Sequence, residues 1–144
     1  MQGGHGYFFQ GTSADYLDLL ATSASTIRTA DPEALVLTGG QAGMQPEFTD
    51  FWRPVLLEAG GSFDIGNIHS IGSDSSFFSA PYREFLDSNG YADIPFWVTE
   101  ALLPTMPAPG QRAPTGDQLA RNTFTGFASA LADGADRIFN VGPH

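Results

Sequence analysis

The chain has 144 residues, 42% of them apolar, which is enough for one domain with a sizeable core. It has no cysteine, which excludes disulfides and thiolate metal sites, and no apolar run approaches the roughly 20 residues that a membrane-spanning helix needs. The 16 acidic residues, six arginines and no lysine give a formal net charge of -10, which repels phosphate backbones, so we expect neither a nucleic acid nor a membrane as a partner.

The first predicted element is a helix over residues 14–29, which Thr12 can cap. Asp31-Pro32 ends this helix, because proline cannot continue the hydrogen-bonding pattern. The apolar run at 34–38 is typical of a buried parallel strand and ends at Gly39-Gly40.

A second helix is predicted over 48–59 and a second strand over 63–68. The third helix starts near Pro81, a residue that suits a first helical turn, and ends at Asn89-Gly90. The run at 96–100 is the third predicted strand.

Thr115 and Gln118 form a capping-box pattern that starts a fourth helix, which Gly134 ends before a last strand over 137–141. Strands separated by helices predict parallel pairing with right-handed crossovers. Four strands and four helices are half of a (βα)8 TIM barrel, and we expect residues 1–144 to form strands five to eight of one. An open flavodoxin-like sheet is the alternative, and composition and periodicity do not separate the two.

The connections that follow the predicted strands, at 41–47, 69–80 and 101–114, are longer than those that precede them. The long connections therefore gather at the carboxyl ends of the strands, where barrels and open parallel sheets both build their active sites.

Glu100 ends the run at 96–100 and is the strongest candidate for a catalytic residue. Because side chains alternate along a strand, we expect Glu100 to share a face with Phe96 and Val98. A carboxylate at the carboxyl end of a barrel strand is often catalytic, whereas the simpler alternative is a solvated side chain.

His69 follows the second predicted strand, on the same face as Asn67, and is positioned to hydrogen-bond a sugar hydroxyl or the Glu100 carboxylate. The alternative is a histidine that only caps the strand. We expect no metal site, because His5, His69 and His144 lie far apart and show no ligand spacing.

Phe77 and Phe78 are apolar residues in a predicted loop, and their rings could stack on sugar faces or simply pin the loop to the body. Residues 39–43, with the sequence GGQAG, lack the spacing of a phosphate-binding loop. We expect them to form a tight turn where the backbone passes close to its neighbours.

With these residues placed, the chain resembles the clan A glycoside hydrolases, especially the xylosidase-like and cellulase-like families. The resembling segments cover nearly the whole chain and are YLDLL at 16–20, ADPEA at 30–34, FDIGNIH at 63–69 and WVTE at 97–100. Each is short, and their order and spacing carry more weight than any one of them.

The resemblance implies that Glu100 is the nucleophile of a retaining glycosidase and that His69 contacts substrate or nucleophile. Asn67, Phe77 and Phe78 complete the candidate substrate-binding residues. It implies a carbohydrate substrate with β-linkages, and neither a metal nor an organic cofactor.

The chain departs from the family pattern in one respect. The acid/base of such enzymes is the glutamate of an Asn-Glu pair, and this sequence contains no Asn-Glu. We therefore expect a catalytic pair that is split, with the missing N-terminal half-barrel as a partner, and little or no turnover by this chain alone. Two alternatives are a non-enzymatic half-barrel that binds or self-associates and a flavodoxin-like domain that binds a small molecule.

Overall fold

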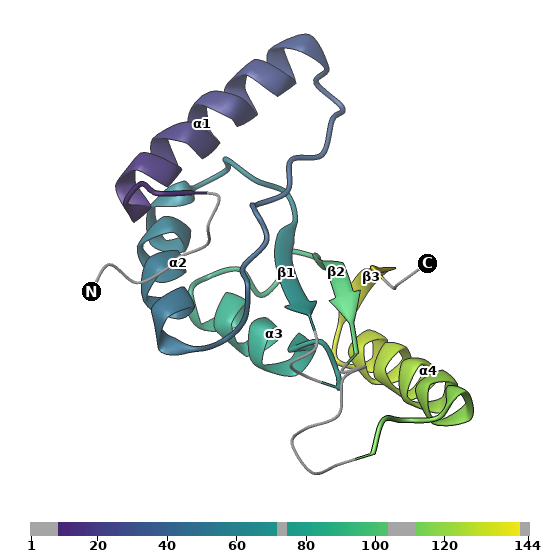
Figure 1. Ribbon diagram of the computed structural model, residues 1–144. Coiled ribbons are helices and arrows are strands. Elements are labelled where there is room, and N and C mark those ends of the chain that lie inside the picture. The colour runs from purple at the N-terminus through teal and green to yellow at the C-terminus, as the bar shows by residue number, and fades with distance from the viewer. Residues whose placement is uncertain (1–8, 72–74, 104–111, 142–144) are drawn as a thin grey trace.

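The computed structural model describes residues 9–71, 75–103 and 112–141. Helices and strands alternate along the second half of the chain. The three strands form one parallel sheet in the order β1-β2-β3 (Figure 1). The elements are α1 (Ser13–Ala30), α2 (Pro46–Ala59), β1 (Gly66–Ile71), α3 (Ser79–Ser88), β2 (Phe96–Leu102), α4 (Gly116–Ala132) and β3 (Ala135–Asn140).

The expected half of a (βα)8 barrel with four parallel strands is wrong, because the described residues contain a sheet of three strands. The strand expected at 34–38 is instead an irregular segment that touches the start of β1 through two isolated bridges, Leu37 with Ile65 and Gln41 with Ile68. Its backbone bonds partly to side chains, since the Gly39 N–H donates to the Tyr16 hydroxyl at 2.6 Å. A segment whose amides are taken by side chains does not complete a regular ladder.

Local signals in the sequence set the helix ends. The Thr12 hydroxyl accepts a hydrogen bond from the Asp15 N–H, and the Asp15 carboxylate accepts one from the Thr12 N–H. Thr115 and Gln118 form the same reciprocal pair at the start of α4. These capping boxes satisfy amides that would otherwise lack partners, so the two longest helices start where the sequence predicts. No helix among the described residues is both long enough and apolar enough to cross a membrane.

Helices α3 and α4 cover one face of the sheet, whereas α1 packs on α2. Helix α3 contacts β1 and α4, and α4 contacts β3. Right-handed crossovers between consecutive neighbouring strands place both of these helices on the same side. One continuous core joins this face to the helices, and its fully buried members include Val55, Ile68, Leu86, Phe96 and Val98. Among the three described strands the order is consecutive, without the reversal that marks a flavodoxin-like sheet.

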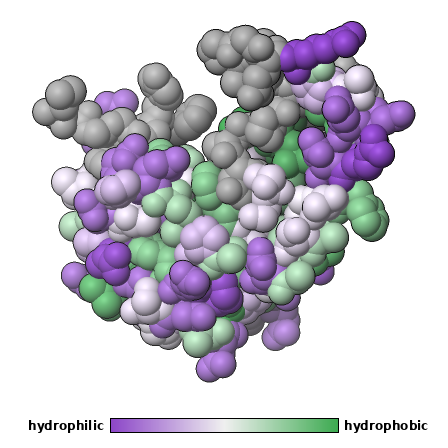
Figure 2. All heavy atoms as spheres, turned by 90° about the horizontal axis from the view of Figure 1, so that it is seen from below, coloured by the Kyte–Doolittle hydropathy of each residue, from purple (hydrophilic) through white to green (hydrophobic). Residues whose placement is uncertain are grey.

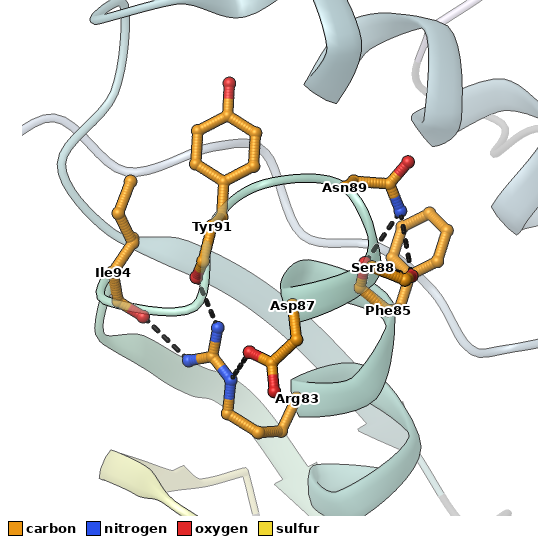
Figure 3. A network of polar contacts seen from close by, with 7 residues as sticks. All are labelled: Arg83, Phe85, Asp87, Ser88, Asn89, Tyr91 and Ile94. Atoms are coloured by element: carbon orange, nitrogen blue, oxygen red, sulfur yellow. Dashed lines mark hydrogen bonds and ion pairs between the residues drawn. The ribbon is translucent and has the colours of Figure 1, made fainter.

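Arg83, in the middle of α3, ties this helix to the connection that leads into β2 (Figure 3). Its guanidinium donates to the backbone carbonyls of Tyr91 and of Ile94, the latter at 2.7 Å, and pairs with Asp87 at 2.7 Å. The same guanidinium lies 5.7 Å from the centre of the Phe96 ring. Arg83 therefore fixes the entry into β2, the strand that carries Glu100.

Candidate functional site

A β-bulge in β2 sets the orientation of the candidate nucleophile. Ile68 of β1 is paired with Val98, but the next residue, His69, is paired with Glu100, so Thr99 is an additional residue in β2. The register between β2 and β3 shifts at the same place. Bulges re-aim side chains and are frequent beside active sites.

The bulge breaks the simple alternation of side chains along β2. Val98 and Ala101 are both fully buried in the core below the helices, whereas Thr99 and Glu100 both contact His69 on the opposite face. The expectation that Glu100 shares a face with Phe96 and Val98 is therefore wrong. The extra residue turns the Glu100 carboxylate away from the helical layer.

Glu100 and His69 form the centre of the site. The His69 Nδ1 atom lies 3.3 Å from Glu100 Oε2, and the exposed fractions of the two side chains are 25% and 42% respectively. The other ring nitrogen, Nε2, lies 2.9 Å from the hydroxyl of Thr99. Thr99 thus holds the His69 ring from the protein side, and both side chains of the pair remain partly exposed to solvent.

Asn67 extends this arrangement into the protein. Its Oδ1 accepts a 2.7 Å hydrogen bond from the Thr99 hydroxyl, and its Nδ2 donates to the Thr38 carbonyl at 3.2 Å. The backbone N–H of Asn67 donates to the Tyr82 hydroxyl at 2.9 Å. Because both ends of its amide are bonded inside the protein, Asn67 reaches a ligand only through the residues that it holds.

Gly40 makes room for the imidazole. A Cβ atom placed on Gly40 would lie 1.9 Å from His69 Nε2, a distance that no real side chain tolerates. The backbone on either side of Gly40 is fixed, because the Gln41 N–H donates to the Asn67 carbonyl and the His69 N–H donates to the Gln41 carbonyl. The GGQAG segment thus passes close to its neighbour, and the neighbour is the ring of the candidate site.

Burial and charge act against each other on His69. Burial of the ring lowers the pKa of His69, and the negative charge of Glu100 opposes this shift. Burial also raises the pKa of the Tyr82 phenol, which stays neutral at ordinary pH. Over the residues that the structure describes, no three His, Asp or Glu side chains gather in a way that could hold a metal ion.

The two loop phenylalanines proposed for sugar stacking pack against the protein instead of standing free. The Phe77 ring is fully buried and meets the Phe127 ring edge-on, at 5.4 Å between centres. Phe78 is partly buried and packs against the same core. Both residues have φ of 57°, which is unusual for a bulky side chain, so packing must hold this turn in place.

The site lies toward the carboxyl ends of β1 and β2, the end to which the strand arrows point in Figure 1. Figure 2 views the molecule from that end and shows polar and apolar residues interleaved over the described surface. His5 and His144 lie outside the described residues. The Phe9 ring packs edge-on against the rings of Tyr16 and Phe51.

Thr99, Thr38 and Gly40 also belong to the site and were not predicted from the sequence. Strict alternation placed Thr99 on the opposite face from Glu100, and no signal in the sequence revealed the bulge. Only the glycine pair at 39–40 hinted at close backbone approach.

No known family model matches the sequence of this chain, and no curated protein matches it either.

Proposed function

We propose that the chain is part of a retaining glycoside hydrolase that acts on a β-linked saccharide, with Glu100 as the nucleophile. One observation carries the proposal: a partly exposed carboxylate stands at a bulge toward the carboxyl end of a parallel strand, 3.3 Å from a histidine on the neighbouring strand. This is the end of a parallel sheet at which ligands bind. The resemblance of FDIGNIH and WVTE to clan A sequences supports the same residue.

In the proposed reaction the Glu100 carboxylate attacks the anomeric carbon, and the bond from that carbon to the leaving oxygen breaks. A second carboxylic acid gives its proton to the leaving oxygen, and water then hydrolyses the glycosyl ester of Glu100. His69 lies beside the attacking carboxylate, at 3.3 Å, and is positioned to contact the sugar. No metal or organic cofactor enters this scheme.

The second carboxylate has no candidate in an Asn-Glu pair of this chain. Proton donation by a positioned acid typically contributes roughly 10²- to 10⁴-fold to the rate. We therefore expect little or no hydrolysis of natural glycosides by these 144 residues alone. A substrate whose leaving group needs no proton should still react with Glu100, because its first step does not depend on proton donation.

The test uses 2-deoxy-2-fluoroglycosides with a dinitrophenolate leaving group, offered to the chain as a panel of sugars. Such reagents trap the glycosyl ester, so we expect a mass increase of one fluorosugar and, after digestion, a modified peptide that contains Glu100. Glu100→Gln should abolish labelling, whereas Glu84→Gln, at an exposed position of α3, should not change it. Label on another residue, or no label from any sugar of the panel, would contradict the proposal.

A second candidate function is self-association, which the surface around β3 favours. In the described sheet β3 has β2 on one side and no strand on the other. Phe124 and Phe139, which lie on α4 and β3, are 77% and 45% exposed. Open strand edges beside apolar side chains invite pairing between chains.

Size-exclusion chromatography with light scattering tests this alternative. The charge of -10 opposes association, so the measurement needs enough salt to screen it. A mass that rises with concentration would support self-association, and Phe139→Ser should then reduce it. A monomer at all concentrations would contradict it.

A further inference from the structure

The hydrogen bonds that link Thr38, Asn67, Thr99 and His69 have donors and acceptors that can be assigned, beginning with the Thr38 carbonyl. A carbonyl oxygen can only accept, so the Asn67 side-chain atom that lies 3.2 Å from it must be the nitrogen. The Thr38 carbonyl is itself held, because the backbone N–H of this buried residue donates to the Ile65 carbonyl at 3.1 Å. The amide of Asn67 therefore cannot be flipped.

The next two steps follow from counting protons. Asn67 Oδ1 is an acceptor, so the hydroxyl of Thr99, at 2.7 Å, donates its one proton to it. The Thr99 oxygen then has only lone pairs left for His69 Nε2, at 2.9 Å. Nε2 must therefore carry a hydrogen, and the neutral imidazole exists as the Nε2–H tautomer.

This tautomer leaves Nδ1 of His69 facing Glu100 Oε2 at 3.3 Å. When the ring is neutral, Nδ1 and the carboxylate are both acceptors and repel each other. When the ring takes one proton from solvent, Nδ1 becomes a donor and the contact becomes a charge-assisted hydrogen bond. The net charge of the His69–Glu100 pair then changes from -1 to zero.

We propose that Asn67 and Thr99 are positioning residues that lock His69 in the Nε2–H tautomer, so that Nδ1 alone gains and loses the proton that joins His69 to Glu100. The catalytic meaning of this lock depends on the proposed role of Glu100 as nucleophile. A neutral His69 leaves two acceptors side by side, and one donor, such as a sugar hydroxyl, can bridge them. A protonated His69 engages the carboxylate itself and competes with the sugar.

Among the described residues, Glu100 is the charged group that contacts the His69 imidazole, and the other groups packed around the ring are uncharged. The segment packed on the ring contributes Gly40, which has no side chain, and Gln41, which is uncharged. Helix α3 contributes the Tyr82 hydroxyl next to Asn67, and α1 contributes the Tyr16 hydroxyl next to Gly39. Burial raises the pKa of both phenols, so neither titrates together with the histidine.

Nitrogen NMR of the full chain reads this tautomer directly. Long-range ¹H–¹⁵N spectra of the ¹⁵N-labelled protein separate the two ring nitrogens of each of the three histidines, and His69→Gln assigns the signals of interest. Above the titration of His69 we expect a protonated-type shift for Nε2 and a lone-pair-type shift for Nδ1. A predominant Nδ1–H form, or shifts averaged between both nitrogens, would overturn the proposal without any variant.

Substitutions of Thr99 test the first of the two positioning residues. Thr99→Val removes the acceptor for Nε2–H, so the neutral ring gains the Nδ1–H form, and the titration midpoint should fall by about 0.4–1 pH unit. Thr99→Ser should restore the original tautomer and midpoint, and Thr29→Val, which removes an exposed helix hydroxyl, should change neither. Unchanged His69 signals in a folded Thr99→Val protein would overturn the role of Thr99.

Asn67→Ala gives a result that a merely structural role would not produce. It frees the Thr99 hydroxyl to donate to Nε2, so the tautomer should change toward Nδ1–H while Thr99 is still present. Persistence of the Nε2–H form would overturn the role of Asn67. None of these readouts needs turnover or labelling, so a failure of the lock and a failure of Glu100 as nucleophile are separate outcomes.

Discussion

The two faces of β1 and β2 differ in what they require of their side chains. On the face below the helices, Ile68, Phe96 and Val98 are apolar and fully buried. On the other face, Asn67 and His69 belong to a polar chain in which each group has a specific partner. The first face needs only apolar side chains of suitable size, whereas the second needs particular atoms at particular positions.

This difference explains what a change should do on each side. A substitution on the helical face should lower the free energy of unfolding and leave the state of His69 as it is. A substitution on the polar face should change the proton on His69 at a smaller cost in stability.

The largest effect is expected for Phe96→Ala, on the helical face. Phe96 is fully buried, and its truncation should lower the free energy of unfolding by about 3–5 kcal/mol through lost burial and a cavity. Denaturant titration measures this, and Phe124→Ala, at a ring that is 77% exposed, should change stability by less than about 0.5 kcal/mol. In the protein that remains folded, the His69 tautomer should be that of the wild type, and a changed tautomer would break the separation.

Much of the helical face could be predicted from the sequence. The capping residues Thr12 and Thr115 gave the starts of two helices, and the apolar run at 96–100 gave β2. These signals depend on short stretches of chain and on burial, which the residue types report directly.

The polar face and the strand count could not be predicted in the same way. The bulge at Thr99 depends on the register between β2 and both of its neighbours, which no single segment encodes. The strand expected at 34–38 was wrong, since the Val36 N–H bonds to the Asp64 side chain and the N–H of Gly39, just beyond it, bonds to the Tyr16 hydroxyl. Glu100, His69 and Asn67 were identified as candidates, but Thr99, Gly40 and the positioning role of Asn67 were found only in three dimensions.

Arg83→Ala should have the next largest effect. It removes the donors for the carbonyls of Tyr91 and Ile94 and should lower the free energy of unfolding by about 2–3 kcal/mol. The pair with Asp87 adds little, because that carboxylate is 46% exposed. Arg121→Ala, at an exposed position of α4, is the control and should change stability by less than about 0.5 kcal/mol.

The Arg83 prediction also tests how strongly the fold supports the site. If the α3–β2 connection sets the entry into β2, the titration of His69 in Arg83→Ala should shift together with the loss of stability. A stable protein with normal His69 signals would show that the bulge holds Glu100 without this anchor.

Gly40→Ala acts on the polar face by displacing the ring. The added Cβ would meet His69 Nε2 at 1.9 Å, so the imidazole must leave Thr99, at a cost of about 1–3 kcal/mol in unfolding free energy. We also expect the His69 signals to become averaged between the two tautomers. Gly61→Ala is the matched control, because a Cβ there meets nothing within 4 Å and its φ needs no glycine, so it should be neutral or slightly stabilising.

The smallest effect is expected for Asp64, which holds the segment that carries Gly40 against the sheet. The hydrogen bond from the Val36 N–H lowers the pKa of Asp64, and the Arg28 guanidinium adds to this shift against the opposing effect of partial burial. A lowered pKa in the folded state means that the contribution is complete above the unfolded value of about 3.9 and is lost as the pH falls through the folded value. Because the carboxylate is 34% exposed, solvent screening limits the contribution to less than about 1 kcal/mol.

Asp64→Asn should therefore reduce the loss of stability between pH 5 and pH 2, measured by denaturant titration of variant and wild type at each pH. The amide oxygen can still accept from Val36, so the segment should remain in place and the His69 tautomer should not change. If the tautomer changes as well, the irregular segment and the site form one cooperative unit, and the two faces of β1 and β2 are then separate in chemistry but not in stability.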